Sequence, residues 1–248
     1  MTDQISYLDN AAATAVGLDY KRRSTAALDV RPGQTVADLG CGPGTDLGRL
    51  ADAAGPDGTV LGVDRDPAML AEAARRYADR PTVAVRVGDL HELPLADESL
   101  DRVRADRTLQ HVDDPAKALA EVRRVLRPGG LFAMAEPDWD TLAVADDDIE
   151  VSRGFARFLA GRVRNPTIGR ELPRLCERAG LRVRAVEPIP ALFRDFDTAD
   201  RILGLRRNTA RAVEAGLLAS AYADPWLRRL ASGPVVVGFM FYLVLASG

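Results

Sequence analysis

Three glycines at alternate positions, Gly40, Gly42 and Gly44, directly follow the apolar, β-prone run 35–39. An amphipathic segment, 46–54, comes immediately after them. The order strand, glycine turn, helix lets a backbone approach a nucleotide-like ligand, because no Cβ atoms stand in the way. A dinucleotide fingerprint, G-x-G-x-x-G, counted from Gly40 would need its last glycine at Thr45. The segment therefore predicts a nucleotide-type site, and its spacing disfavours NAD.

Short strands and helices alternate over residues 35–135. We expect strands at 35–39, 59–63, 83–87, 101–105 and 131–135, with helices at 46–54, 67–78 and 116–126 between them. Asp66-Pro67 and Asp114-Pro115 each combine a capping side chain with a proline at the first helical position. Such alternation implies a parallel sheet covered on both faces, with ligands beyond the carboxyl ends of its strands.

The rhythm stops after residue 136. The segment 1–34 is expected to be helical and 35–139 to form the core, while 140–166 and 190–233 are expected to be helical cap insertions over the ligand face. Residues 167–189 and 234–248 are expected to return to the same core, with a helix at 167–179 and strands at 181–186 and 235–245. The fold expectation is thus an α/β, Rossmann-like doubly wound sheet of seven strands with helical cap insertions.

Aromatic residues gather in the second half of the chain, since ten of the fourteen lie after Pro137. Aromatic side chains bury large apolar areas and line small-molecule pockets. Their clustering favours an apolar pocket beneath the cap, although each of them could equally pack the added helices.

Composition narrows the choice of partners and compartment. A net charge of −3 argues against a nucleic-acid footprint. Two cysteines, Cys41 and Cys176, do not suggest a disulfide framework and fit a reducing cytosol. The first residues lack a signal-peptide layout, and the longest apolar run, 234–246, is too short to span a membrane. We expect a cytoplasmic protein without a membrane partner, and leave the oligomeric state open, with a homodimer as one option.

Two carboxylates follow neighbouring strands. Asp64 ends the second strand, where a carboxylate can accept hydrogen bonds from both ribose hydroxyls. It could instead cap the next helix, but Asp66 already suits that role. Asp89 ends the third strand after Gly88, where the alternative is a turn residue.

A second run carries a family resemblance. The segments 101–112 and 114–119, followed by Arg124-Val-Leu-Arg-Pro-Gly-Gly130, resemble the UbiE-like (type 11) methyltransferases. The glycine pattern D-x-G-x-G-x-G, which opens at Asp38, resembles motif I of the class I S-adenosylmethionine (SAM) methyltransferases. The resemblance covers residues 35–137, is weaker over 167–186 and 235–246, and leaves both insertions uncovered.

The resemblance implies SAM as cofactor and S-adenosylhomocysteine as product. Asp64 would bind the ribose, while Asp89 and the backbone of Leu90 would bind the adenine. Arg65 or Met69 would cover the adenine face, with core packing as the alternative for Met69. Arg107 would meet the SAM carboxylate, or else form a structural ion pair with Asp106. Asp38 would hold the loop or the amino end of the methionine portion, and the other residues implied in cofactor binding are Gly40, Cys41, Gly42 and Gly44.

The implied reaction is methyl transfer to an O or C atom of a small, largely apolar molecule, with secondary metabolism as a setting. No Asn-Pro-Pro-Tyr motif or Pro-Cys loop of DNA methyltransferases is present. His111, beyond the fourth strand, has the pKa range of a general base, but could instead tie its loop together. Glu136 and Asp138 are further catalytic candidates, with a solvated acidic loop as the alternative.

Other assignments stay open. His91 is expected to face solvent. Nothing in the spacing of the acidic residues requires a metal ion, so none is expected. One rival function is a SAM-binding enzyme of this fold that catalyses another reaction, such as a cyclisation. Another is a non-catalytic SAM-sensing protein.

Overall fold

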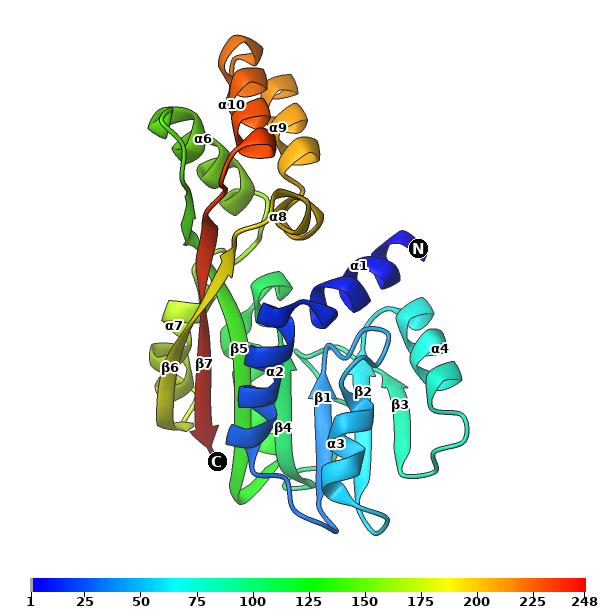
Figure 1. Ribbon diagram of the computed structural model, residues 1–248. Helices are drawn as coiled ribbons and strands as arrows, with labels where there is room; N and C mark the ends of the chain where they lie inside the picture. Colours follow the sequence, from blue (N-terminus) through cyan, green and yellow to red (C-terminus); the bar gives the residue numbers. More distant parts are fainter. Residues whose placement is uncertain (1) are drawn as a thin grey trace.

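The computed structural model describes residues 2–248, so residue 1 of the expected 1–34 segment lies outside the described chain. Seven strands form one sheet in the order β3-β2-β1-β4-β5-β7-β6 (Figure 1). The first five are parallel, and β7 is antiparallel to both of its neighbours. This confirms the expected α/β fold. The strands are β1 (Thr35–Leu39), β2 (Thr59–Asp64), β3 (Val83–Val87), β4 (Leu100–Asp106), β5 (Leu126–Val144), β6 (Arg182–Phe193) and β7 (Val237–Ser247).

Helices cover both faces of the sheet. Side chains of β1 alternate between two apolar clusters: Val36 packs with Leu50 on the face covered by α2 and α3, and Ala37 packs with Leu119 on the face covered by α5 and α7. This is the period-two pattern of a strand buried on both sides. The helices that cover the two faces of the sheet are α2 (Ala15–Leu28), α3 (Leu47–Ala54), α4 (Pro67–Arg76), α5 (Pro115–Val125) and α7 (Ile168–Arg178).

The two expected helix caps are present. The carboxylate of Asp66 accepts the Ala68 N–H at 2.9 Å, and that of Asp114 accepts the Lys117 N–H at 3.0 Å. Each satisfies one of the free N–H groups of a first helical turn. The caps fix where α4 and α5 begin, and so where the loops after β2 and β4 end.

The N-terminal segment contains two helices. α1 (Thr2–Ala13) and α2 meet at Thr14, whose hydroxyl accepts the Gly17 N–H at 3.0 Å as the cap of α2. α2 lies against the sheet, while α1 turns away across the carboxyl ends of the strands (Figure 1). The Tyr7 hydroxyl on α1 donates to the Ile202 carbonyl at 3.2 Å, which joins this helix to the cap.

Strands β5 and β6 are longer than expected, and together with β7 they continue beyond the rest of the sheet (Figure 1). β7, expected at 235–245, has the expected length but runs from Val237 to Ser247. We expected helix from residue 140, but β5 runs to Val144, and β6 runs to Phe193 rather than to 186. Polar residues in β5 and two prolines in β6 obscured the alternation. The apolar strand β7 pairs with both, at Ala143↔Gly238 and Pro190↔Met240, and so supplies the contacts that make them strands.

The four helices carried by these strands form the cap: α6 (Ile149–Ala160), α8 (Phe196–Leu203), α9 (Leu205–Glu214) and α10 (Ser220–Ser232). Trp226 of α10 is fully buried, lies with its ring centroid 5.3 Å from that of Phe155 in α6, and donates to the Ser152 hydroxyl at 2.9 Å. The cap thus has a small core of its own. None of the described helices is long and apolar enough to cross a membrane.

Candidate functional site

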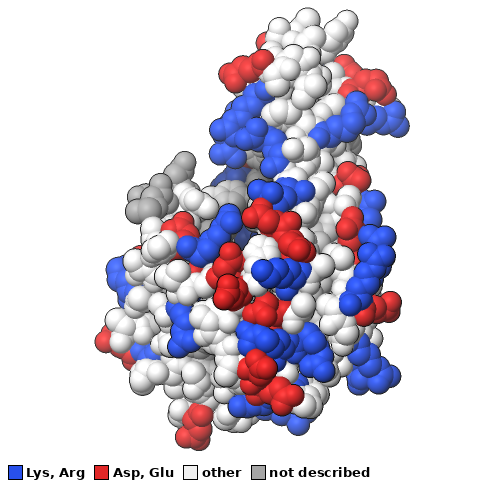
Figure 2. All heavy atoms as spheres, turned by 180° about the vertical axis from the view of Figure 1, so that it is seen from behind, with Lys and Arg blue, Asp and Glu red and all other residues white. Residues whose placement is uncertain are grey.

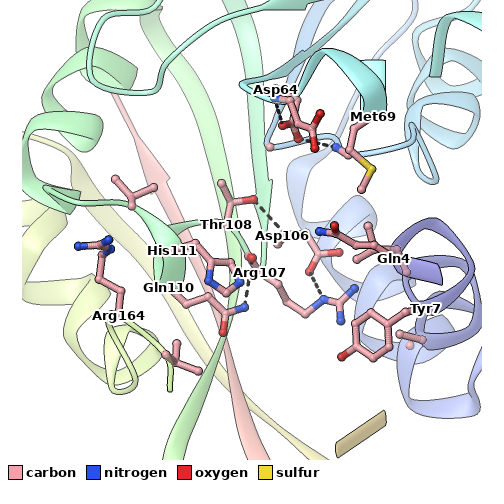
Figure 3. A pocket seen from close by; sticks show the side chains of 18 of the residues that line it. Gln4, Tyr7, Asp64, Met69, Asp106, Arg107, Thr108, Gln110, His111 and Arg164 are labelled. Atoms are coloured by element: carbon pink, nitrogen blue, oxygen red, sulfur yellow. Dashed lines mark hydrogen bonds and ion pairs between the residues drawn. The ribbon is translucent and has the colours of Figure 1, made fainter. Parts of the chain in front are cut away.

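A cavity of about 820 Å³ lies between the carboxyl ends of the core strands, helices α1 and α2, and the cap (Figure 3). This volume is within the usual range for small-molecule sites. One end, here called the strand end, is bounded by the loops after β1, β2 and β3. The opposite end, here called the cap end, is lined by Trp139, Arg162, Val163, Arg164, Phe193, Ile202, Arg207, Phe239 and Phe241.

Two glycines shape the strand end. Gly40 has φ +70°, and a Cβ there would fall 2.3 Å from the Thr108 hydroxyl oxygen, so the loop after β1 closes onto the loop after β4 only with glycine. Gly42 has φ +53° and lines the cavity, and a Cβ at this position would have the Leu8 side chain, at 3.5 Å, as its nearest neighbour. The loop therefore presents bare backbone to a ligand.

Asp64 holds this loop in place. One carboxylate oxygen accepts the Gly42 N–H at 2.8 Å, and the other accepts the Asp66 N–H at 3.0 Å. The side chain also lines the cavity, with Arg65 and the buried Met69 beside it. A carboxylate with two backbone donors still has free lone pairs for ligand hydroxyls.

The loop after β3 completes the strand end. Asp89, Leu90 and His91 all line the cavity. The expectation that His91 faces solvent is wrong: its Nδ1 lies 2.6 Å from the Asp89 carboxylate, and its Nε2 accepts the Asp114 N–H at 3.0 Å. The backbone N–H and ring of His91 lower the pKa of Asp89. His91 therefore fixes this loop against the start of α5.

Three residues expected at the SAM site do not line the cavity. Asp38 is buried and paired with Arg104, and the thiol of Cys41 lies in the core beside Gly62. Gly44 is packed beneath α4, where its carbonyl accepts the Tyr77 hydroxyl at 2.8 Å. Spacing alone did not show which side of the loop faces the core. These three residues support the loop from behind.

Beneath the glycine loop lies a buried ionic network. Lys21 of α2 contacts the carboxylates of Asp46 and Asp106. Arg104 of β4 reaches Asp46 at 3.0 Å, Asp106 at 2.9 Å and Asp38 at 2.9 Å. Three carboxylates are thus matched by the charges of Lys21, Arg104 and the neighbouring Arg107. Although burial opposes it, Lys21 and Arg104 lower the pKa of Asp106, and Asp106 raises the pKa of Lys21.

Arg107 points into the middle of the cavity, beside Tyr7 (Figure 3). Its backbone has φ +52°, and its N–H donates to the Ala135 carbonyl at 2.9 Å. Its buried Nε has no hydrogen-bond partner among the described residues and lies 3.9 Å from Asp106. A buried guanidinium with so loose a partner can receive an anionic group.

His111 ends the short 3-10 helix Leu109–His111 and lines the cavity between its two ends (Figure 3). Its side chain lines the cavity while remaining exposed to solvent. Partial burial and the positive charges of Arg107 and Arg65 lower the pKa of His111 below its ordinary value of 6.5. The imidazole is therefore neutral near pH 7 and able to accept a proton.

Glu136 and Asp138, the other catalytic candidates, are fully buried and do not line the cavity. Glu136 accepts the N–H groups of Thr108 and Leu109 at 2.7 and 2.6 Å, so it shapes the turn that carries His111. Burial raises the pKa of Glu136 to about 8, against these donors. Asp138 is paired with Arg170 on α7. Both residues, expected as catalytic candidates, therefore support the site from within the core, and they do not form the solvated acidic loop that was the alternative.

An aromatic wall forms the cap end. Trp139 stacks on Phe239 with their ring centroids 4.7 Å apart. The centroid of the Phe239 ring lies 5.2 Å from that of Phe241 and 6.3 Å from that of Phe193. These rings come from β5, β6 and β7, whose extensions bring them together. Among the described residues, no group of three or more His, Cys, Asp or Glu side chains is arranged to hold a metal ion.

Several contributors could not be identified from the sequence. Gln4 and Tyr7 reach the cavity from α1, and Tyr20 and Gln110 line it from α2 and the 3-10 helix. Lys21, which supports the site through the ionic network, stands out in the sequence as one of only two lysines. It lies in a basic cluster on a helix, however, and such a cluster usually marks a solvated face. Its burial depends on tertiary contacts with β4.

Residues 37–134 match the family model described as "Methyltransferase domain". The chain is 51% identical, over 99% of its length and 71% of the relative, to an uncharacterised 37.1 kDa protein of transposon TN4556 from Streptomyces fradiae. It is 34% identical to an arsenite methyltransferase of Halobacterium salinarum, over 79% of the chain and 51% of that relative. A demethylmenaquinone methyltransferase of Beutenbergia cavernae is 40% identical over 50% of the chain and 52% of that relative. The chain thus spans about half the length of these two named enzymes.

Solved structures show the same fold at lower identity. The YcgJ protein of Bacillus subtilis superposes with a TM-score of 0.67 and 18% identity, over 92% of the chain and 97% of that structure. The [4+2]-cyclase SpnF superposes with a TM-score of 0.60 and 18% identity, over 92% of the chain and 79% of that structure.

Proposed function

Because the chain belongs to the class I SAM-dependent methyltransferases, we propose that it transfers the methyl group of SAM to an O or C atom of a small, largely apolar molecule. The observation that carries this proposal is one cavity with a backbone-lined strand end and an aromatic cap end, and His111 between them. A setting in secondary metabolism and a cytoplasmic location are part of the same proposal.

The strand end fits the nucleoside part of SAM. The free lone pairs of Asp64 would accept the ribose hydroxyls, and Asp89 with the Leu90 backbone would hold the adenine. Met69 and Arg65 would cover the ring. Carboxylates at this end also favour a ligand that carries a positive sulfonium.

The methionine portion would lie along the glycine loop toward Arg107. The guanidinium of Arg107, which lines the cavity and pairs only loosely with Asp106, suits the SAM carboxylate, and the Gly40 and Gly42 backbone leaves room for the chain. When bound, SAM supplies an activated methyl group, so alignment and exclusion of water provide much of the rate enhancement.

His111 is proposed as the general base. As the acceptor oxygen or carbon attacks, the bond from sulfur to the methyl carbon breaks, S-adenosylhomocysteine leaves, and the acceptor proton passes to the imidazole. Glu136 orders the turn that carries His111 through the backbone of Thr108 and Leu109. Such a base typically contributes a factor of roughly 10²–10⁴.

The acceptor is proposed to be organic rather than arsenic. Both cysteines are buried and free, and neither lines the cavity. Burial raises the pKa of the Cys176 thiol to about 12 and also raises that of Cys41. Protonated, buried thiols do not act as ligands or nucleophiles.

Calorimetric titration with SAM, S-adenosylhomocysteine and NAD tests the first step. We expect micromolar binding of the first two and none of NAD. Absence of SAM binding would overturn the proposal. A screen of apolar hydroxylated and acidic-carbon compounds then tests transfer, through S-adenosylhomocysteine formed only when an acceptor is present.

The likeness in fold to the cyclase SpnF supports one alternative, namely that the protein binds SAM but catalyses a different reaction. Conversion of an acceptor without formation of S-adenosylhomocysteine would favour that alternative. Binding of SAM with no conversion of any compound would favour the non-catalytic sensor.

A further inference from the structure

Charge is divided unevenly along the cavity. At the strand end the three carboxylates of Asp64, Asp66 and Asp89 outnumber the one guanidinium, that of Arg65. Among the described residues that line the cap end, none carries a carboxylate, whereas three are arginines: Arg162, Arg164 and Arg207. The two ends are therefore built for ligand groups of opposite charge.

The cap-end arginines differ in how far their charge is neutralised. Arg164 pairs with Asp113 at 2.8 Å. Arg162 lies with its guanidinium carbon 5.7 Å from the centroid of the Phe158 ring. Arg162 and Arg207 are both exposed, and neither makes an ion pair with a described residue. In Figure 2, Lys and Arg side chains gather where the cap meets the rest of the molecule, while both signs mix over the lower body.

These arginines come from separate elements. Arg162 follows α6, and Arg207 lies in α9, 45 residues later in the chain. Both line the cavity that contains the aromatic wall of Trp139 and Phe239. Two cations beside a stacked aromatic surface provide separate contacts for an acidic group and for an apolar body.

We propose that the acceptor is an amphipathic acid, whose carboxylate or phosphate is held by Arg162 and Arg207 while its apolar body lies on the aromatic wall. This inference rests on the proposed function, because it names the acceptor class for the same cavity. Arginine suits either acid group, since its planar fork donates two parallel hydrogen bonds. The SAM-facing Arg107 is not needed for it.

Binding of matched aromatic probes to the protein loaded with S-adenosylhomocysteine tests the proposal. The probes are 2-naphthoate, 2-naphthyl phosphate and the neutral 2-naphthamide, titrated by calorimetry or ligand-observed NMR. We expect at least one anion to bind roughly tenfold more tightly than the amide, as charged hydrogen bonds imply. The stronger of the two anions identifies the acid group.

The double variant Arg162→Gln/Arg207→Gln should remove that preference and leave amide binding unchanged. The control Arg178→Gln/Arg211→Gln removes two exposed arginines of α7 and α9 that do not line the cavity, and should keep the preference. Equal binding of anions and amide, no binding of either anion, or a preference unaltered in the first variant would overturn the inference.

Prior titration of every sample with S-adenosylhomocysteine distinguishes failure of the proposed function from failure of the acidic-acceptor inference. Failure to bind it would refute the proposed function itself. Binding of S-adenosylhomocysteine without any preference for the anionic probes would refute only the acidic acceptor.

Discussion

The two ends of the cavity are built from different material. The strand end consists of short loops, whose backbone is held by Asp64 and by the network around Lys21. The cap end consists of side chains brought together by three long strands and four helices. Backbone fixed by turns specifies one ligand shape, whereas a wall of side chains can change residue by residue.

The largest expected effect comes from breaking the ionic network of Lys21, Asp46, Asp106 and Arg104, which holds the strand end. Lys21→Met would leave Asp46 and Asp106 buried without their partner, and we expect a loss of about 3–5 kcal/mol in unfolding free energy. Urea denaturation measures it. Arg22→Met is the matched control, because Arg22 is exposed in the same helix, and should cost less than about 0.5 kcal/mol. Similar losses in both variants would mean that the network contributes nothing special.

The group between the two ends should affect rate alone. His111→Ala is expected to lower kcat by roughly 10²–10⁴, the usual contribution of a general base, with SAM affinity unchanged. His111→Gln should be equally slow, because an amide hydrogen-bonds but does not accept a proton. Rescue of the rate by glutamine would instead make His111 a positioning residue.

Affinity for SAM should depend on the strand end and on Arg107, and not on the cap end. Asp64→Ala should weaken SAM binding by about 1–3 kcal/mol, since a charged hydrogen-bond acceptor is lost. Asp64→Asn keeps an oxygen for the Gly42 N–H and separates support of the loop from contact with the ligand. Phe239→Leu, at the cap end, should leave SAM affinity unchanged by calorimetry. Equal effects of Asp64→Ala and Phe239→Leu would abolish the division between the ends.

Glu136 lies where β5 leaves the core for the cap. Its pKa is raised from the ordinary 4.5 to about 8 by burial. The folded protein therefore holds that proton more tightly than the unfolded chain, and the stability it contributes below pH 4.5 is lost as pH rises toward 8. Glu136→Gln should flatten this dependence by at least about 1 kcal/mol between pH 5 and pH 8, measured by urea denaturation. An unchanged slope would show that the N–H donors of Thr108, Leu109 and Gln110 keep Glu136 ionised.

The smallest effect concerns pH and rate. Since the pKa of His111 lies below 6.5, kcat/KM should rise with pH through that lowered value and stay level above it. Arg65→Gln removes one of the charges that lower this pKa, and should move the rise to higher pH by a fraction of a unit at saturating SAM. A rise at the same pH would remove Arg65 as a cause.

Sequence reasoning reached the strand end because its signals are local. Gly42, Asp64 and Asp89 follow strands whose periodicity and caps are visible in the chain, and all three line the cavity. Side-chain direction was harder: Asp38, Cys41 and Glu136 lie at the right elements but face the core. For the cap end, the sequence predicted only that aromatic residues gather in this half of the chain. Which of them form the wall depends on the pairing of β7 with β5 and β6.

The continuous strands β5, β6 and β7 have a consequence for how this fold diversifies. Their far ends are joined to each other through β7, so the cap helices at 149–160 and 196–232 can be exchanged, lengthened or lost while the chain re-enters the sheet at the same places. Such replacements leave the turns around Gly42 and Asp64 untouched. A library of variants with different cap segments, joined at these strand ends, would therefore keep the same SAM site while the acceptor site varies.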